Sequence, residues 1–384
     1  MKIGMISQWY EPETGAAAHP TAIARALAAR GHEVKVLTGF PSYPLGRVYD
    51  GHRMRLRARD HRDGIALLRV PDSPSHDQSA RRRALSLTSF AVSAALQVGW
   101  LRDVDVCLTY LTPATVGLAA MTLHRVWGVP YALYVQDLWP ETVTASGFIG
   151  SPGATRRVEG ALNAWLGRLY RGADAIAAIS PTMATTLATR GAAAVPTSIP
   201  NWVDERVFRP VPRCGRPHLD DRRWVMYAGG LGDVQSLDTA LRAMALLDHR
   251  PDLALALAGS GVAVPRLREL AAELGLGDRV RFLGSFTMEE MPAVLAEADA
   301  QLVSLKDLPL FRGTIPSKLQ ASMACGLPIV CAVAGDAAEV VRRSGCGFVA
   351  APEDPAALAD AFRRLADASA VDLTAMGDRA RASY

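Results

Sequence analysis

One lysine stands out among the residues that could do chemistry. Lys318 is one of only four lysines among the 42 basic residues of the chain. It lies in the stretch LFRGTIPSKL, residues 310–319, where Gly313–Ser317 reads as a loop and Ser317 as the start of a helix. A helix begins with free backbone N–H groups, so Lys318 and Arg312 beside them would stabilise a diphosphate leaving group. The alternative is a solvated lysine with no such role.

Glycine-containing loops follow several predicted strands. Gly15 lies in QWYEPETGAAA, before a predicted helix, where the backbone could approach a phosphate closely. Gly229–Gln235 (GGLGDVQ) has the same character, and Gly259–Gly261 opens a GxGxxV string, which is a weak dinucleotide signal. The first loop does not match GxGxxG and no Walker lysine follows it, which disfavours NAD-type and ATP-type loops. A small-residue helix start is the alternative for this loop.

A third kind of loop carries carboxylates and an aromatic ring. QDLWPE, residues 136–141, follows a predicted strand at Tyr131–Val135. Asp137 and Glu141 at the carboxyl end of a strand suit recognition of hydroxyl groups, as in sugar binding. Asp137 as a simple helix N-cap is the alternative.

Short apolar runs alternate with helical patterns through the whole chain. This alternation predicts two doubly wound α/β domains, each with a parallel sheet covered by helices on both faces. Ligands bind at the carboxyl ends of the strands in such sheets. The predicted strands are Lys2–Ile6, Glu33–Leu37, Val104–Tyr110, Tyr131–Val135, Ala175–Ile179, Trp224–Ala228, Leu253–Ala258, Val280–Leu283, Ala300–Ser304 and Pro328–Cys331; the predicted helices include Pro20–Arg30, Ser236–Leu247, Val264–Leu274, Met288–Ala296, Asp336–Arg343 and Pro355–Ala366.

The length of 384 residues also fits two domains. We place them at residues 1–206 and 223–384, joined by a linker at 207–222 that is rich in proline and charge. Residues 1–200 carry 21 basic and 14 acidic residues, a net charge of +7, whereas residues 201–384 carry 21 and 24, a net charge of −3.

Composition excludes several classes of protein. The five cysteines are scattered without a CxxC pair, which argues against a disulfide framework or a zinc site and favours a reducing compartment. The eight histidines show no HxH or HExxH spacing, and no GxSxG elbow appears. The opening MKIGMIS reads as a strand and predicts no signal peptide, so a cytoplasmic location is expected. No nucleic-acid partner is expected.

One segment has a membrane-like composition. Ala84–Leu101 has 18 residues without a charge, the lower limit for a transmembrane helix, but its serine, threonine and glutamine residues make it polar. A mostly buried helix is the favoured interpretation over membrane insertion. Peripheral attachment to the inner face of the membrane is a third possibility, because basic residues gather in His52–Arg69 and Arg81–Arg83. A solvated strand and loop is the alternative for that basic stretch.

Taken in order, these pieces resemble glycosyltransferase family 4, of the GT-B fold, over nearly the whole chain. The residues that carry the resemblance are EPETGAAA, ARGHEVKVLTG, VQDLWPET, SIPNWVD, YAGGLGDVQSLDTAL, RVRFLGSF, TIPSKLQASMACGLPIV and GCGFVAAPEDPAALADAF. VQDLWPET resembles a subgroup that adds amino-sugars or deoxysugars to bacterial cell-surface polysaccharides. The resemblance implies two Rossmann-like domains facing across a cleft, with the acceptor bound by the first and the donor by the second.

The implied reaction is metal-independent, retaining transfer of a sugar, with an N-acetylated hexosamine as one candidate, from a nucleotide sugar to an acceptor hydroxyl. No cofactor is implied beyond the nucleotide sugar as co-substrate, with a UDP-sugar favoured. The acceptor is a lipid-linked sugar or a small-molecule aglycone. Lys318 and Asp137 are the implied catalytic residues. The residues expected to bind substrate are Gly15, Ala16, Gln136, Glu141, Gly230, Leu231, Gln235, Phe282 (facing the base), Arg312, Thr314, Ser317 and Leu319.

The sequence departs from the family pattern at one pair of positions. Gly313 and Ala321 stand where the family has two glutamates eight positions apart, of which the second accepts the ribose hydroxyls. Two other functions therefore stay open. One is a nucleotide-sugar epimerase of similar two-domain shape, and the other is a non-catalytic glycosyltransferase-like subunit.

Overall fold

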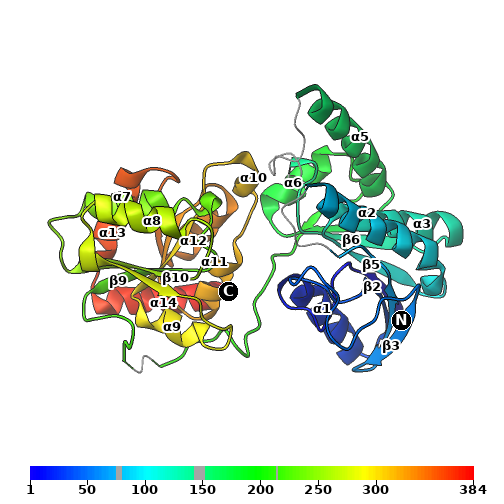
Figure 1. Ribbon diagram of the computed structural model, residues 1–384, viewed down its shortest axis with the longest axis horizontal. Helices are drawn as coiled ribbons and strands as arrows, with labels where there is room; N and C mark the ends of the chain where they lie inside the picture. Colours follow the sequence, from blue (N-terminus) through cyan, green and yellow to red (C-terminus); the bar gives the residue numbers. More distant parts are fainter. Residues whose placement is uncertain (75–79, 142–151, 213–214) are drawn as a thin grey trace. The chain divides into compact units, whose positions relative to one another are not determined.

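The computed structural model describes residues 1–74, 80–141, 152–212 and 215–384. The chain forms two compact units, Met1–Pro200 and Asn201–Tyr384, and each has its own sheet and helices (Figure 1). The division falls after Pro200, whereas the sequence predicted a first domain that extends to residue 206.

The first unit is built on a mainly parallel sheet. Its strands, within the described residues, are β1 Lys2–Ile6, β2 Glu33–Gly39, β3 Ala58–Arg62, β4 Ile65–Val70, β5 Val106–Leu111, β6 Tyr131–Val135, β7 Ala175–Ala178 and β8 Thr197–Ser198. They lie in the order β3-β4-β2-β1-β5-β6-β7-β8, and β3 alone among them runs antiparallel to its neighbour, β4. Strands β2 to β4 therefore lie on one side of β1, and β5 to β8 lie on the other. The order of the strands reverses between β1 and β5, and parallel sheets bind ligands at such a point.

Helices cover this sheet, and residue choice explains where several begin and end. Ser180 accepts a hydrogen bond from the Met183 N–H at 3.2 Å and caps the helix that starts at Pro181. Gly128 takes the left-handed conformation (φ 69°) that ends the helix before it. The helices are α1 Ala18–Ala29, α2 Ala80–Gln97, α3 Gly117–Trp127, α5 Pro152–Arg171 and α6 Pro181–Thr189, with short 3₁₀ turns η1 Gly15–Ala17, η2 Val98–Leu101 and η3 Ala114–Val116.

The apolar segment Ala84–Leu101 forms most of α2 and the η2 turn, beside α3 (Figure 1). It is long and apolar enough to span a membrane by composition, with a mean hydropathy of 1.4, yet only 33% of the window is buried in the protein. Phe90 and Ala94 lie in the core, whereas Leu96 is 81% exposed. The prediction of a mostly buried helix is therefore correct for one face of α2 only.

The second unit has a wholly parallel sheet within the described residues. Its strands are β9 Arg223–Ala228, β10 Leu253–Ala258, β11 Val280–Gly284, β12 Ala300–Ser304, β13 Ile329–Ala332 and β14 Gly347–Val349, in the order β11-β10-β9-β12-β13-β14. Strand β10 (LALALA) is buried along its whole length, as expected for a central strand covered on both faces. The crossover point lies at β9, between β10 and β12.

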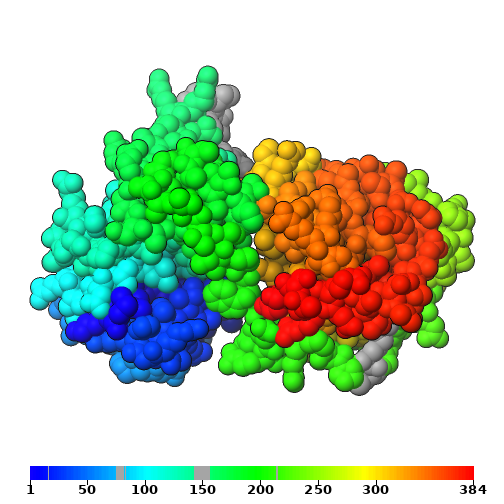
Figure 2. Space-filling view, turned by 180° about the vertical axis from the view of Figure 1, so that it is seen from behind, coloured from blue at the N-terminus to red at the C-terminus, as the bar shows by residue number. Residues whose placement is uncertain are grey.

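The helices of the second unit pack on both faces of this sheet. They are α7 Leu237–Ala245, α8 Val264–Glu273, α9 Met291–Glu297, α10 Pro309–Arg312, α11 Ser317–Ala324, α12 Asp336–Ser344, α13 Pro355–Asp367 and α14 Ala370–Ser383, with 3₁₀ turns η4 Asp233–Gln235 and η5 Gly277–Arg279. Helix α14 (red in Figure 2) packs on α11 and α12. Gly377 allows this close approach, because a side chain there would lie 2.2 Å from the Gly326 carbonyl oxygen.

The segment predicted as an exposed linker is part of the second unit. Leu219 is buried in its core, and the indole N–H of Trp224 donates to Asp220 at 3.0 Å. Arg216 forms an ion pair of 2.8 Å with Asp299, which precedes β12. The charged residues that suggested an exposed linker, such as Arg216 and Asp220, thus bind this segment to the sheet.

Candidate functional site

Lys318 lies where the sequence predicts it, in the first turn of α11, which begins at Ser317. Its ammonium group donates a hydrogen bond to the hydroxyl of Tyr227, on β9, and lies 3.8 Å from the centroid of that ring. The Tyr227 hydroxyl donates in turn to the carbonyl oxygen of Gly230 at 2.8 Å. The lysine, the end of β9 and the glycine loop after it therefore form one connected group at the crossover point of the sheet.

The electrostatics of this lysine are unusual. Burial lowers the pKa of Lys318 from its usual 10.5 to about 7. In the described part of the chain, no carboxylate forms an ion pair with Lys318, and burial is the cause of its lowered pKa. A partly buried cation without a counter-ion, at the N-terminus of a helix, is arranged to accept an anion from outside the protein.

The two glycine loops of the second unit interlock through their backbones. The Leu231 N–H donates to the Ser260 carbonyl oxygen at 2.8 Å, and the Leu231 carbonyl oxygen accepts from the Ala263 N–H at 3.0 Å. A side chain at Gly259 would lie 1.9 Å from the Gly229 carbonyl oxygen. The glycines of the GxGxxV string thus serve loop packing, which explains this string without a dinucleotide.

The predicted residues of the first of these loops have different roles. Gly230 faces open space, with nothing within 4 Å of the position that a side chain would take. The side chain of Leu231 is fully buried in the core, and its backbone N–H and carbonyl oxygen bond to the second loop, so Leu231 has no free group for the predicted ligand contact. The Gln235 side-chain oxygen accepts the Gly232 N–H at 3.0 Å, so Gln235 shapes the loop from within.

The loop before α11 holds the other predicted donor contacts. Arg312 pairs with Asp307 at 3.2 Å, and both side chains are largely exposed, so this pair is weak and a phosphate could replace Asp307. The Thr314 hydroxyl donates to the Leu310 carbonyl oxygen at 3.2 Å. Leu319 has a buried side chain, and its backbone N–H donates to the Pro316 carbonyl oxygen. Leu319 therefore has no free donor for the direct substrate contact that the sequence predicts.

Phe282 lies on β11, at the edge of the sheet. The guanidinium of Arg268, from α8, lies 4.4 Å from the centroid of its ring. The side chain is only partly buried and packs against the core. Contact between Phe282 and a nucleotide base stays a prediction.

In the first unit, Gln136 and Asp137 directly follow β6. The Thr112 hydroxyl, just after β5, donates to Asp137 Oδ2 at 2.6 Å. Burial raises the pKa of the Asp137 carboxyl, and the Thr112 hydrogen bond opposes this shift. Neighbouring strands thus bring Thr112 to Asp137, a partner that the sequence analysis did not find.

Glu141 has a partner that also escaped the sequence analysis. Arg190, which follows α6, binds both carboxylate oxygens of Glu141 and donates to the Trp139 carbonyl oxygen at 2.7 Å. The sequence assigned Glu141 to hydroxyl recognition; in the structure its carboxylate binds Arg190 and holds the loop. A partner 49 residues away gives no local signal.

We expect Arg190→Ala to lower the affinity and turnover for a sugar substrate about tenfold, because the loop that carries Asp137 loses its anchor. Kinetics of Arg190→Ala, Glu141→Gln and the double variant test this, with the exposed Arg168→Ala as the matched control. Equal and non-additive losses identify Glu141 as a loop anchor. A larger loss for Glu141→Gln than for Arg190→Ala would contradict it and favour direct sugar binding.

The opening loop is held by two buried charges. The Glu13 carboxylate accepts the backbone N–H groups of Tyr10, Ser42 and Tyr43 at 2.7–3.0 Å. Arg69, on β4, donates to the carbonyl oxygens of Glu11 and Gly39 at 2.6 and 3.0 Å. These contacts fix the loop by long-range partners that the sequence pattern did not reveal.

Beyond these anchors, the chain enters η1 at Gly15, which is exposed with φ at 66° and leads into α1. Ala16 is the next residue of η1. The backbone at Gly15 is therefore open to solvent ahead of a helix, as the predicted phosphate contact requires.

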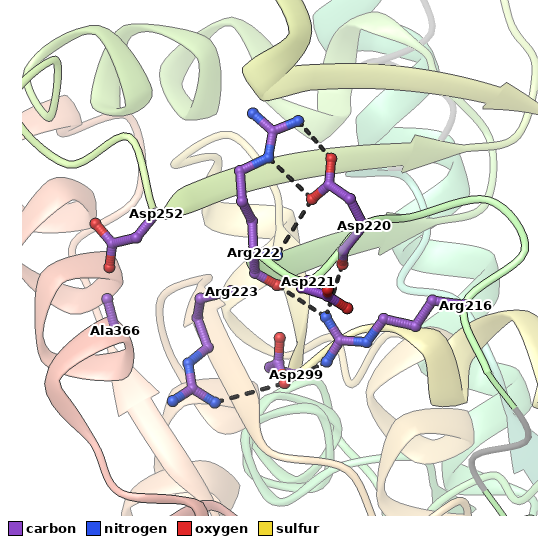
Figure 3. A pocket seen from close by; sticks show the side chains of 8 residues that line it. All are labelled: Arg216, Asp220, Asp221, Arg222, Arg223, Asp252, Asp299 and Ala366. Atoms are coloured by element: carbon purple, nitrogen blue, oxygen red, sulfur yellow. Dashed lines mark hydrogen bonds and ion pairs between the residues drawn. The ribbon is translucent and has the colours of Figure 1, made fainter.

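A hollow of about 740 Å³ lies in the second unit at the amino ends of β9, β10 and β12 (Figure 3). Its charges are neutralised by one another: Asp220 pairs with Arg222 at 2.7 Å, and Asp299 pairs with Arg216 and with Arg223. These ion pairs fasten the segment before β9, so the hollow is a structural junction rather than the candidate site.

Two family models match the chain: "Glycosyl transferase 4-like domain" over residues 14–202 and "Glycosyl transferases group 1" over residues 215–382. The putative colanic acid biosynthesis glycosyl transferase WcaI of Escherichia coli (strain K12) is 28% identical over 344 residues, 85% of this chain and 82% of WcaI. Sucrose-phosphate synthase of Thermosynechococcus elongatus has a similar structure, with a TM-score of 0.73 at 21% identity, over 100% of this chain and 93% of that one. Anabaena HepE in complex with UDP and glucose gives a TM-score of 0.66 at 20% identity, over 100% and 94%.

Proposed function

The chain belongs to glycosyltransferase family 4 and has the GT-B fold, and we propose that it transfers a sugar from a nucleotide-sugar donor to an acceptor hydroxyl with retention. One observation carries the assignment of the donor site. Lys318 is a partly buried cation without a counter-ion in the described residues, at a helix N-terminus beside an open glycine loop. A diphosphate supplies the missing negative charge.

In the proposed reaction, the acceptor oxygen forms a bond to the anomeric carbon, and the bond from that carbon to the diphosphate oxygen breaks. The leaving nucleoside diphosphate gains negative charge, which Lys318 and the N–H groups of the first turn of α11 stabilise. The acceptor proton passes to a phosphate oxygen of the leaving group. Because the protein supplies this positive charge, we propose that turnover needs no metal ion and no cofactor, so a chelator leaves it unchanged.

Two relatives bear on the substrates. HepE binds UDP and glucose, and this supports a UDP-sugar as the first donor to test; an N-acetylated hexosamine is our proposal for the sugar. WcaI is named for colanic acid biosynthesis, and this supports a growing cell-surface polysaccharide on a lipid carrier as the acceptor, ahead of a small aglycone. We propose that the first unit binds the acceptor.

A panel of UDP-, GDP- and TDP-sugars, with and without lipid-linked acceptor, tests the proposal. Release of nucleoside diphosphate that depends on acceptor supports transfer, and the anomeric configuration of the product tests retention. A changed sugar on an intact nucleotide would instead identify an epimerase. Neither binding nor turnover with any donor would identify a non-catalytic subunit.

The pH dependence of UDP binding gives an independent test of Lys318. Its pKa is about 7 in the free protein, and a bound diphosphate raises it. Above about pH 7 binding must therefore take up a proton, so the affinity for UDP should fall by up to about tenfold per pH unit between about pH 7.5 and 9.5. Calorimetry in buffers of different ionisation enthalpy measures the proton uptake. Lys318→Met should abolish it, and pH-independent binding by the unmodified protein would refute the role.

A further inference from the structure

The first unit carries a groove that none of the candidate-site residues lines. It has a volume of about 590 Å³ and lies at the sheet edge formed by β3 and β4, beside the ends of α2 and α3. Apolar, aromatic and basic side chains form most of its lining, among them Leu96, Trp100, Trp127, Arg57, Arg59 and Arg102. The carboxylate of Asp103 also lines it and is paired with Lys35 at 2.7 Å. Apolar, aromatic and cationic side chains in one place are the composition of a membrane-interface site.

Large apolar side chains are exposed to solvent on the elements that line the groove. Leu56, in the segment before β3, is 79% exposed, and Leu96, near the end of α2, is 81% exposed. The Gln97 side chain donates to the Leu56 carbonyl oxygen at 2.6 Å, which joins these two elements. We call the following set the apolar rim: Met54, Leu56, Leu85, Val92, Leu96, Val126 and Trp127, all exposed.

The apolar rim has a regular origin in the sequence. Leu85, Val92 and Leu96 are spaced by seven and four residues, so they share one face of α2. Trp127, at the end of α3, packs against Gly99, where a side chain would lie 2.9 Å from its ring. Trp127 thus lies beside the C-terminal end of α2, next to the turn that follows this helix.

Arginines alternate with two residues of the apolar rim, Met54 and Leu56. Arg53, Arg55, Arg57 and Arg59 alternate with apolar residues in RMRLRAR, and all four are exposed. In the part of the chain that the structure describes, none of these four, nor Arg102, forms an ion pair. Arg69 differs from these arginines, because its side chain is buried. It holds the opening loop and does not contribute to this exposed positive charge. Within the described residues, the charges of these five arginines have no carboxylate partner.

We propose that the apolar rim and its arginines form a docking surface for an anionic lipid membrane. The exposed leucines and Trp127 enter the headgroup region, while the arginines contact lipid phosphates. Helix α2 lies in the plane of the interface and does not cross the bilayer, because Phe90 and Ala94 on its inner face are part of the protein core. The unpaired arginines favour an anionic lipid surface over an apolar protein partner by charge complementarity.

This proposal goes beyond sugar transfer and does not depend on it, so its test needs no substrate. The full chain is incubated with vesicles of phosphatidylcholine alone or with about 30% phosphatidylglycerol, and bound protein is separated by flotation. We expect binding to the anionic vesicles and a marked loss of binding at high salt. Arg57→Gln with Arg59→Gln should lower partitioning more than tenfold, from about 1 kcal/mol per basic residue near the surface.

Leu56→Ser with Leu96→Ser tests the apolar part and should lower binding at least tenfold while leaving thermal unfolding unchanged, because both side chains are exposed. Arg209→Gln and Val371→Ser, exposed positions of the second unit, are the matched controls and should bind as the unmodified protein does. Absence of binding to anionic vesicles, equal binding to neutral ones, or unchanged binding by both double variants would overturn the proposal. Vesicle binding that persists in every variant would place the contact elsewhere and overturn it equally.

Discussion

Lys318→Ala is expected to lower turnover by about 10²–10³-fold, the loss typical for removal of one preorganised group that stabilises a developing negative charge. The reason lies in the placement of the ammonium group. It is held by the Tyr227 hydroxyl and ring at the N-terminus of α11, and no carboxylate in the described residues forms an ion pair with it. A bound diphosphate raises the pKa of Lys318 above its value of about 7 in the free protein, so the ammonium group is charged when the diphosphate leaves. Initial rates with saturating donor and acceptor measure the effect.

Three further variants make the result specific. Lys318→Arg keeps the charge but cannot keep the same contact with Tyr227, so we expect a partial loss. Tyr227→Phe removes the hydroxyl that accepts from Lys318 and donates to Gly230, and should reduce turnover without removing the cation. Lys2→Ala, an exposed lysine of the first unit, is the matched control. Near-normal turnover for Lys318→Ala would sink the assignment of the donor site.

The sequence sufficed to place Lys318 because its signals are local. The small loop, the helix start at Ser317 and the scarcity of lysine all lie within a few residues of it. The strands also followed from local apolar runs, and the predicted bounds of Lys2–Ile6 and Leu253–Ala258 agree with the structure. Strands β3 and β4 were not predicted, because the arginine-rich stretch hides their pattern.

What the sequence could not provide is the set of partners that lie far along the chain. Tyr227 is 91 residues from Lys318, and Arg190 is 49 residues from Glu141. Glu13 reads as one acid in an opening loop, yet its carboxylate accepts the backbone N–H groups of Ser42 and Tyr43, 29 and 30 residues away. Such pairs depend on which strands become neighbours in the sheet. The local residue pattern of a single sequence does not reveal this strand order.

The second large effect is expected at Gly259, where alanine should destabilise the second unit by about 3 kcal/mol or more. A side chain there would lie 1.9 Å from the Gly229 carbonyl oxygen, and φ is 142°, a conformation that side chains rarely adopt. For a unit of this size, the midpoint of thermal unfolding should fall by roughly 10 °C. Calorimetry of the whole chain, in which the two units can unfold separately, measures the shift.

Gly230 supplies the matched control, because it belongs to the same loop but has nothing within 4 Å of its would-be side chain. Gly230→Ala should leave the unfolding midpoint unchanged, yet weaken UDP binding if the backbone of this loop lies against the diphosphate. The pair separates two roles of glycine that the sequence cannot distinguish: packing of loop against loop at Gly259, and access for a ligand at Gly230. Unchanged stability of Gly259→Ala would contradict the interlocked loops, whereas unchanged UDP affinity of Gly230→Ala would move the diphosphate away from this loop while leaving the fold argument intact.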